Sequence, residues 1–196
     1  MFAELLAQPG VVETVELRSQ FGFLAFHGGS LEQVTDTVAS AAAERAGASL
    51  YTVAQPPELR WHIPSRMVTP DASTKLAAFL DHVEVAVAIH GYGREGRWTD
   101  ILVGGGNREL AARVGQALGA ALPDYTIVDD LHQVPPELRG LHPDNPINRV
   151  RGGGVQLELP TRVRGLGPVW AHWEGPGLPP PTAALIDALA GVARRD

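Results

Sequence analysis

The sequence contains no cysteine. Disulfide bonds, thiolate nucleophiles and cysteine metal ligands are therefore excluded, so a metal could be held only by His, Asp or Glu. No apolar run approaches the roughly 20 residues that cross a bilayer, and we expect no membrane-spanning segment. The N-terminal stretch MFAELLAQPGVVETVELR lacks a basic segment followed by an apolar one. It does not resemble a secretory signal, which predicts a cytoplasmic location.

Basic residues are also in the minority. The chain has 16 Lys and Arg against 22 Asp and Glu, giving a net charge of −6. This balance argues against a general nucleic-acid binder, because neutralising phosphates requires a basic face. The 196 residues are 44% hydrophobic and 19% charged. With no internal repeat and no second composition regime, residues 1–196 are expected to form a single domain.

Glycine and proline, in contrast, are frequent, with 22 and 16 residues. Between these breaks, apolar runs typical of strands alternate with segments that have helical periodicity. The expected strands cover 21–26, 49–54, 83–89, 99–105, 125–128 and 153–159, and the expected helices cover 31–47, 73–81, 107–122 and 182–195. The alternation predicts an α/β domain of three layers, α/β/α, with a mixed, largely parallel sheet.

Two of the expected helices carry N-terminal signals. Asn107 is a suitable cap for the helix that follows it. Ser30, with Gln33 three residues later, forms a capping-box pattern that would begin the helix over 31–47. Glu32 would then lie in the first helical turn, close to the preceding strand.

Three expected strands finish with a side chain able to bind metal or move protons: His27, His90 and Glu158. Ligands of open α/β sheets bind outside the carboxyl ends of the strands. A lone histidine there is usually structural. Here two histidines occupy equivalent positions, and each is followed by a glycine that lets the backbone approach a ligand. We therefore expect a shared site.

Glu32 completes a candidate metal-binding set with His27 and His90. On its own, a carboxylate in a first helical turn is explained by the helix dipole, worth under about 1 kcal/mol. Two His and one Glu are a known set for one zinc ion, with the fourth position open to water. Zinc lowers the pKa of such a water toward about 7 and polarises a carbonyl. The same set admits other divalent ions.

Glu158 is the candidate general base, which would take a proton from water and return it to a leaving amine. In the expected strand, Gln156 and Glu158 project to one side while Val155, Leu157 and Leu159 project to the other. A buried carboxylate costs several kcal/mol unless it is paired or its pKa is shifted. The alternative to a general base is that Glu158 forms a structural salt bridge with a nearby arginine.

Arginines are concentrated around this strand. Between residues 147 and 167 the only acid is Glu158, whereas the basic residues are Arg149, Arg151, Arg162 and Arg164. In an acidic protein this excess favours an anionic substrate held by guanidinium groups. Arg149 is the strongest candidate, and Arg164 could equally be a solvated surface residue. His62 could contact substrate or pack against Trp61.

Together these motifs resemble the zinc-dependent poly-γ-glutamate hydrolase family of phages and bacteria, whose fold is carboxypeptidase-like. The resemblance covers residues 21–165. FHGGSLE is similar to the family's His-Gly-Gly…Glu segment, WHIPS to its His-Ile-(Thr/Pro)-Ser stretch, and VAIHGYG to the segment of its second metal histidine. NPINRVRGGGVQLELP is similar to its Asn-Arg…Gly-Gly-Val-Gln-Leu-Glu-Leu signature.

The resemblance implies roles for individual residues. His27, Glu32 and His90 would be the zinc ligands, Glu158 the general base, and Asn148 and Arg149 would bind a substrate carboxylate or the oxyanion. Two stretches depart from the family's pattern. Residues 33–37 read QVTDT instead of Pro-Gly-Thr-Ser-Glu, and residues 66–71 read RMVTPD instead of an acidic segment with proline.

The expected activity is thus a zinc amidohydrolase that cleaves γ-glutamyl or similar amide bonds in an anionic, peptide-like substrate. A metallocarboxypeptidase or deacylase for small N-acyl amino acids is an alternative. A non-catalytic binding domain that keeps the fold is another. A phage-derived protein of this kind would be released by lysis.

Overall fold

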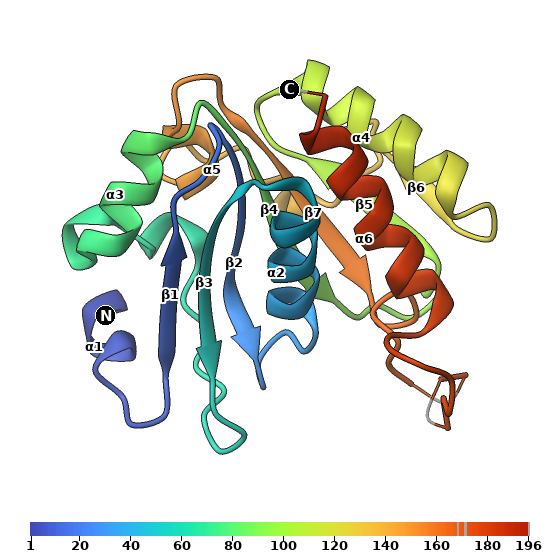
Figure 1. Cartoon of the computed structure of the whole chain (residues 1–196), viewed down its shortest axis with the longest axis horizontal. Helices are drawn as coiled ribbons and strands as arrows, with labels where there is room; N and C mark the ends of the chain where they lie inside the picture. The colour runs from blue at the N-terminus through green and yellow to red at the C-terminus, as the bar shows by residue number, and fades with distance from the viewer. Residues whose placement is uncertain (168, 171, 196) are drawn as a thin grey trace.

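The computed structural model describes residues 1–167, 169–170 and 172–195. In this part of the chain, seven strands form one mixed sheet in the order β1-β3-β2-β4-β7-β5-β6 (Figure 1). The strands are β1 (Val12–Glu16), β2 (Phe21–Gly29), β3 (Ser49–Gln55), β4 (Val85–Tyr92), β5 (Asp100–Gly104), β6 (Thr126–Val128) and β7 (Gly154–Pro160). The pairs β3–β2, β2–β4, β4–β7 and β5–β6 are parallel, whereas β1–β3 and β5–β7 are antiparallel. The predicted α/β fold with a mixed, largely parallel sheet is confirmed.

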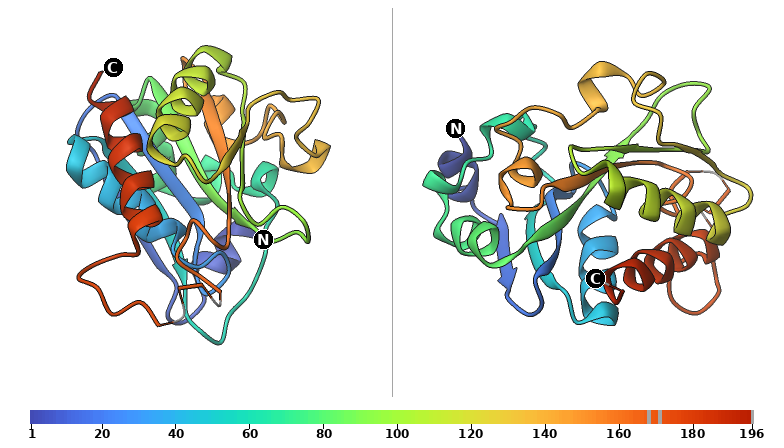
Figure 2. Two further views of the ribbon diagram at one scale, coloured as in Figure 1. Left: turned by 90° about the vertical axis from the view of Figure 1, so that its right-hand side faces the viewer. Right: turned by 90° about the horizontal axis from the view of Figure 1, so that it is seen from above.

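Helices cover both faces of the sheet (Figure 2). The α-helices are α1 (Phe2–Leu6), α2 (Thr35–Ala46), α3 (Thr74–His82), α4 (Arg108–Ala121), α5 (Pro146–Arg149) and α6 (Pro180–Ala193), and three 3₁₀ turns are η1 (Ser65–Met67), η2 (Pro70–Ala72) and η3 (Pro136–Leu138). α2, α4 and α6 pack on one face, and α1, α3 and α5 lie on the other. None of the described helices is long and apolar enough to span a membrane.

The side chains of β2 show how the two cores form. Phe21, Phe23 and Ala25 belong to the core under α2 and α6, whereas Leu24 and Phe26 belong to the core under α3. Successive residues of a strand point to opposite faces, so a central strand covered on both faces is apolar throughout. This explains why FGFLAF is a continuous apolar run.

One predicted helix start is wrong. α2 begins at Thr35, and the residue before it, Val34, has a left-handed backbone (φ 76°) and no side-chain capping bond. The Ser30 hydroxyl instead donates to the carbonyl of Leu59, 2.5 Å away. Residues 30–34 form turns between β2 and α2. Glu32 therefore precedes the helix, and the capping-box pattern of Ser30 and Gln33 is not used.

Other predicted boundaries agree better. The Asn107 side chain accepts a hydrogen bond from Leu110 N at 2.9 Å, which confirms it as the cap of α4. β2 and β4 continue two residues past His27 and His90, so both histidines lie within strands rather than at their last residue. The edge strand β1 and the short helices α1 and α5 were not predicted.

Candidate metal centre

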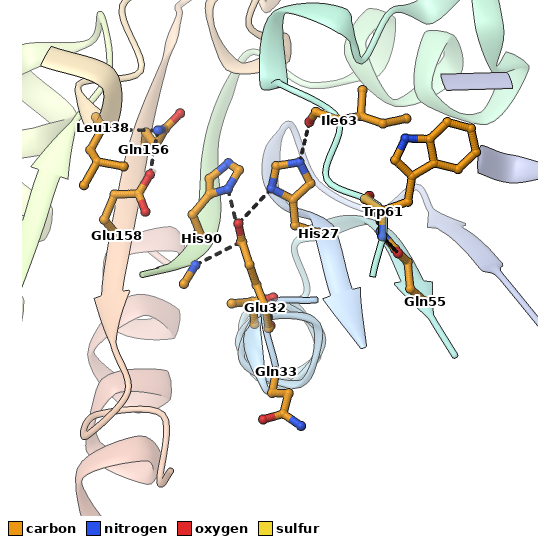
Figure 3. A network of polar contacts seen from close by, with 12 residues as sticks. His27, Glu32, Gln33, Gln55, Trp61, Ile63, His90, Leu138, Gln156 and Glu158 are labelled. Atoms are coloured by element: carbon orange, nitrogen blue, oxygen red, sulfur yellow. Dashed lines mark hydrogen bonds and ion pairs between the residues drawn. The ribbon is translucent and has the colours of Figure 1, made fainter. Parts of the chain in front are cut away.

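His27, Glu32 and His90 meet at one end of the sheet (Figure 3). His27 lies on β2 and His90 on the neighbouring parallel strand β4. His27 Nδ1 lies 2.9 Å from Glu32 Oε1, and His90 Nδ1 lies 3.3 Å from Glu32 Oε2. The two imidazole rings have their centroids 4.9 Å apart in an edge-to-face arrangement. The structure thus brings together all three predicted metal ligands.

Glycines after His27 allow the chain to return Glu32 to the histidines. Gly29 has φ +69°, and a Cβ atom on it would lie 2.2 Å from the carbonyl oxygen of Gln55 on β3. Only glycine fits such a close backbone approach. The chain then turns so that Glu32 N donates to His27 O at 2.9 Å. Glu32 Oε2 also accepts a hydrogen bond from Gly91 N at 2.9 Å, which fixes the carboxylate between β2 and β4.

The hydrogen bonds of His27 show that this donor set fits a cation. His27 Nε2 lies 2.8 Å from the carbonyl oxygen of Ile63. A carbonyl only accepts, so Nε2 carries a hydrogen and a neutral His27 presents the Nδ1 lone pair to Glu32. A lone pair and a carboxylate oxygen 2.9 Å apart repel unless a proton or a metal ion lies between them. A backbone carbonyl on the far nitrogen is also the usual support of a metal-binding histidine.

His90 has the same orientation toward Glu32 but a different environment behind it. Its ring is 3% exposed, and Nε2 is buried without a hydrogen-bond partner among the described residues. Burial raises the pKa of the Glu32 carboxyl, but the charges of His90 and His27 outweigh this and hold that pKa well below its usual range. Glu32 is therefore ionised at neutral pH, as a carboxylate that binds a metal must be.

Glu158 lies beside His90, because the two are paired residues of the parallel strands β4 and β7. Its side chain is on the same strand face as Gln156, whereas Val155, Leu157 and Leu159 enter the core under α2 and α6. This confirms the predicted two-sided pattern. Burial raises the pKa of the Glu158 carboxyl to about 7, against a smaller lowering by His90.

Two amide side chains that were not predicted as site residues form a chain of hydrogen bonds that ends on the Glu158 carboxylate. Gln156 Nε2 donates to Glu158 Oε1 at 2.8 Å, and Asn145 Nδ2 donates to Gln156 Oε1 at 2.7 Å. Asn145, Gln156 and Glu158 are each at most 4% exposed. The sequence did hold a signal for Gln156, since it stands two residues before Glu158 on one strand. Asn145 lay in a stretch that looked irregular.

A cavity of about 710 Å³ opens over the three metal-binding candidates. One wall is the segment that follows β3, and the other is the segment from η3 to α5. The residues that line it are His27, Leu31, Glu32, His62, Pro64, Ser65, Arg66, His90, Gly91, Tyr92, Pro136, Glu137, Leu138, Gly140, Leu141, His142, Asn145, Gln156 and Glu158. Metal-binding candidates and the candidate base therefore share one concave site.

His62, predicted to contact substrate, lies in this cavity and next to His27. Their ring centroids are 4.8 Å apart. Donor atoms of His27, Glu32 and His62 all lie within 4.8 Å of one another, so His62 is a second candidate for the third ligand position. It differs from His90 in being exposed. The part of the ring that is shielded by the cavity wall is still desolvated enough to lower the pKa of His62, and the nearby His27 lowers that pKa further.

The other three predicted substrate-binding residues do not line the cavity. Asn148 Nδ2 donates to the carbonyls of Gly140 and His142, at 2.7 and 2.9 Å. Arg149 forms an ion pair with Asp144, with Nη2 2.8 Å from Oδ1. Arg164 is 6% exposed and donates to two backbone carbonyls. Contact of these residues with a substrate stays a prediction.

Comparison with solved structures shows that the mixed α/β sheet has a carboxypeptidase-like fold. The structure of a bacteriophage poly-gamma-glutamate hydrolase has a TM-score of 0.75 and 23% identity, covering 96% of this chain and 91% of that chain. The structure of a zinc-free form of a protein named YNDL has a TM-score of 0.75 and 22% identity, covering 93% of this chain and 88% of that chain. The structure of a putative carboxypeptidase from Burkholderia mallei has a TM-score of 0.56 and 12% identity, covering 95% of this chain and 59% of that chain.

At these identities the structural likeness establishes the fold alone. The family follows from the sequence. The model of the poly-gamma-glutamate hydrolase family matches residues 2–166, and the chain belongs to this family. The predicted resemblance is thereby confirmed and extended toward the N-terminus. A search of curated proteins finds no match.

Proposed function

We propose that the protein is a zinc-dependent amidohydrolase that cleaves γ-glutamyl amide bonds in an anionic, peptide-like substrate. One observation carries the proposal: His27, Glu32 and His90 converge at the floor of a cavity that Glu158 also lines. Membership of a family of poly-gamma-glutamate hydrolases supports both the reaction type and the substrate.

His27, Glu32 and His90 would hold one zinc ion. The two Nδ1 atoms and the Glu32 carboxylate supply the two nitrogens and one oxygen of a known catalytic zinc set. Zinc bound there supplies Lewis acidity, which makes water easier to deprotonate and polarises an amide carbonyl. The hydrogen bonds that His27 Nε2 donates to Ile63 O and that Gly91 N donates to Glu32 Oε2 keep two of the three ligands in place.

Glu158 would move the proton. Its position beside His90 places the carboxyl at the cavity floor, and its pKa of about 7 suits a group that must accept a proton and give it back. The proton taken from water would pass to the nitrogen of the leaving amine. Gln156 would hold one carboxylate oxygen and leave the other directed to the substrate.

The test combines metal content with hydrolysis. Purified protein is expected to contain one equivalent of zinc and to cleave poly-γ-glutamate. Glu158→Gln is expected to reduce kcat about 10²- to 10⁴-fold while zinc remains bound. Glu84→Gln is the control, because Glu84 is exposed and paired with Arg151 away from the cavity. Protein without a stoichiometric divalent metal, or unchanged kcat in Glu158→Gln, would contradict the proposal.

The same assay separates the alternatives. Cleavage of small N-acyl glutamates without cleavage of the polymer would indicate a deacylase or carboxypeptidase. Zinc bound without hydrolysis of either substrate would indicate a binding domain.

A further inference from the structure

An anionic substrate requires a positive group in the cavity besides the metal, and most arginines near it are already engaged. Arg149 is paired with Asp144. Arg94 is paired with Glu137, a residue of η3 that lines the cavity. Arg164 is buried and donates to backbone carbonyls. None of these three guanidinium groups lines the cavity.

Arg66 differs from these three arginines both in its position and in its lack of a bonding partner among the described residues. It lies in η1, is exposed, and lines the cavity beside His62 and Ser65. No described residue forms an ion pair or side-chain hydrogen bond with its guanidinium group. On the opposite wall, the charge of Glu137 is neutralised by its ion pair with Arg94. The unpaired positive charge of the cavity therefore lies on the wall that carries Arg66. A substrate anion would be drawn to that wall.

The backbone that carries Arg66 is fixed relative to the metal centre. Three residues before it, Ile63 is fully buried, and its carbonyl oxygen accepts from His27 Nε2 at 2.8 Å. Two residues after it, Val68 is 1% exposed in the same core. Met67 N donates to Pro64 O at 2.7 Å and closes the turn between these anchors. The exposed side chain therefore extends from a backbone held in place on both sides, which suits capture of a ligand at a defined distance from His27.

We propose that Arg66 is a specificity-determining residue that binds a substrate α-carboxylate while the scissile amide lies at the metal centre. The proposal rests on the proposed function. In a γ-linked glutamyl chain every unit keeps a free α-carboxylate, and a guanidinium group can hold a carboxylate by two parallel hydrogen bonds.

Binding is measured first, in the zinc-loaded Glu158→Gln background, so that turnover does not interfere. The probes are a γ-linked glutamyl trimer and the same trimer with its α-carboxylates converted to carboxamides. Adding Arg66→Gln is expected to weaken binding of the carboxylate trimer about 10- to 100-fold and to leave binding of the carboxamide trimer unchanged. Arg66→Lys, which keeps the charge without the fork, is expected to lie between.

Arg45→Gln is the matched control, since it removes an exposed arginine that is paired with Asp187 and does not line the cavity. This control is expected to leave the binding of both probes unchanged. Equal binding of both probes by Arg66→Gln and its parent would overturn the proposal. So would a selective loss in Arg45→Gln alone. Thermal unfolding of each variant shows whether a loss of binding reflects a loss of fold.

Hydrolysis by the protein with Glu158 intact separates this proposal from the proposed function. If both trimers are cleaved and Arg66→Gln leaves their KM values unchanged, the subsite is wrong and the hydrolase stands. If neither is cleaved but the carboxylate trimer still depends on Arg66 for binding, the subsite stands and the hydrolase is wrong. Absence of binding and of cleavage would overturn both.

Discussion

His90 of β4 and Glu158 of β7 are directly paired residues of adjacent parallel strands. The pairing places a metal-binding candidate and a candidate base side by side on one rigid sheet, yet their environments differ. His90 Nδ1 faces the Glu32 carboxylate, whereas Glu158 accepts from the neutral amide of Gln156. Burial raises the pKa of Glu158 to about 7, because the opposing effect of the nearby His90 is smaller. Such a carboxyl costs the fold stability, and the cost can be measured.

Glu158→Gln is expected to stabilise the metal-free protein at alkaline pH. The pKa of Glu158 is raised on folding, so ionisation favours the unfolded state as pH rises from about 4.3 to about 7. The penalty is then roughly 3 kcal/mol at about pH 8 and under about 1 kcal/mol near pH 5. Urea unfolding at the two pH values should show Glu158→Gln gaining stability over the parent mainly at the higher one.

The control for this prediction is Glu84→Gln, which removes an exposed carboxylate that is paired with Arg151. It should give no comparable gain at the higher pH. A gain of equal size for Glu158→Gln at both pH values would mean that its carboxyl does not titrate as burial dictates.

The third ligand position can be assigned by comparing His90→Ala with His62→Ala. His90 is buried and its Nδ1 lies 3.3 Å from Glu32, whereas His62 is exposed. We expect His90→Ala to weaken zinc binding more than about 100-fold, and His62→Ala to change it less than about 10-fold. Competition with a fluorescent chelator measures both. The reverse order would make His62 the ligand.

The two histidines among the metal-binding candidates were predictable because each lies on a strand. Apolar runs located β2 and β4, and parallel strands bring their carboxyl ends to one edge, so His27 and His90 could be placed together from sequence. The setting of Glu32 was not predictable in the same way. Ser30 has the local pattern of a helix cap, but its hydroxyl is taken by Leu59, which is distant in sequence.

The arginines show a second limit. A count of charges near Glu158 favoured Arg149 and Arg164, but pairing depends on tertiary structure. Asp144 neutralises Arg149, and backbone carbonyls bind Arg164. Among the described residues, Arg66 is the arginine that lines the cavity, but no other arginine adjoins it in the sequence, so a count of local charges does not indicate it. Similarly, β1 has the weakly apolar sequence VETVE, and only its antiparallel pairing with β3 makes it a strand.

The turn that returns Glu32 can be tested through Gly29. Gly29 and Gly47 have nearly equal φ values, +69° and +66°, but a Cβ on Gly29 would meet the Gln55 carbonyl, whereas Gly47 has nothing within 4 Å. Gly47→Ala should cost about 1 kcal/mol of unfolding free energy from backbone strain alone. Gly29→Ala should cost about 3 kcal/mol or more and also weaken zinc binding. Equal costs in urea unfolding would contradict the clash.

Arg164 links the segments that carry two of the metal-binding candidates. Nη1 donates to Gln33 O at 2.8 Å, one residue after Glu32, and Nη2 lies 3.3 Å from Tyr92 O, two residues after His90. The guanidinium group packs on Gly91, where a Cβ would lie 2.7 Å from its Cζ. Gly91 N in turn donates to Glu32. These contacts favour a positioning role for Arg164 over contact with substrate.

The two roles predict different kinetics for Arg164→Lys, which keeps the charge but cannot bridge both carbonyls with one ammonium group. A positioning role predicts zinc affinity about 10- to 100-fold lower, with KM unchanged once zinc is saturating. Arg162→Gln, an exposed neighbour, should leave zinc affinity unchanged. A substrate role predicts the opposite, a raised KM at unchanged zinc affinity. Because Arg164 is buried and already bonded to two carbonyls, we expect the first result.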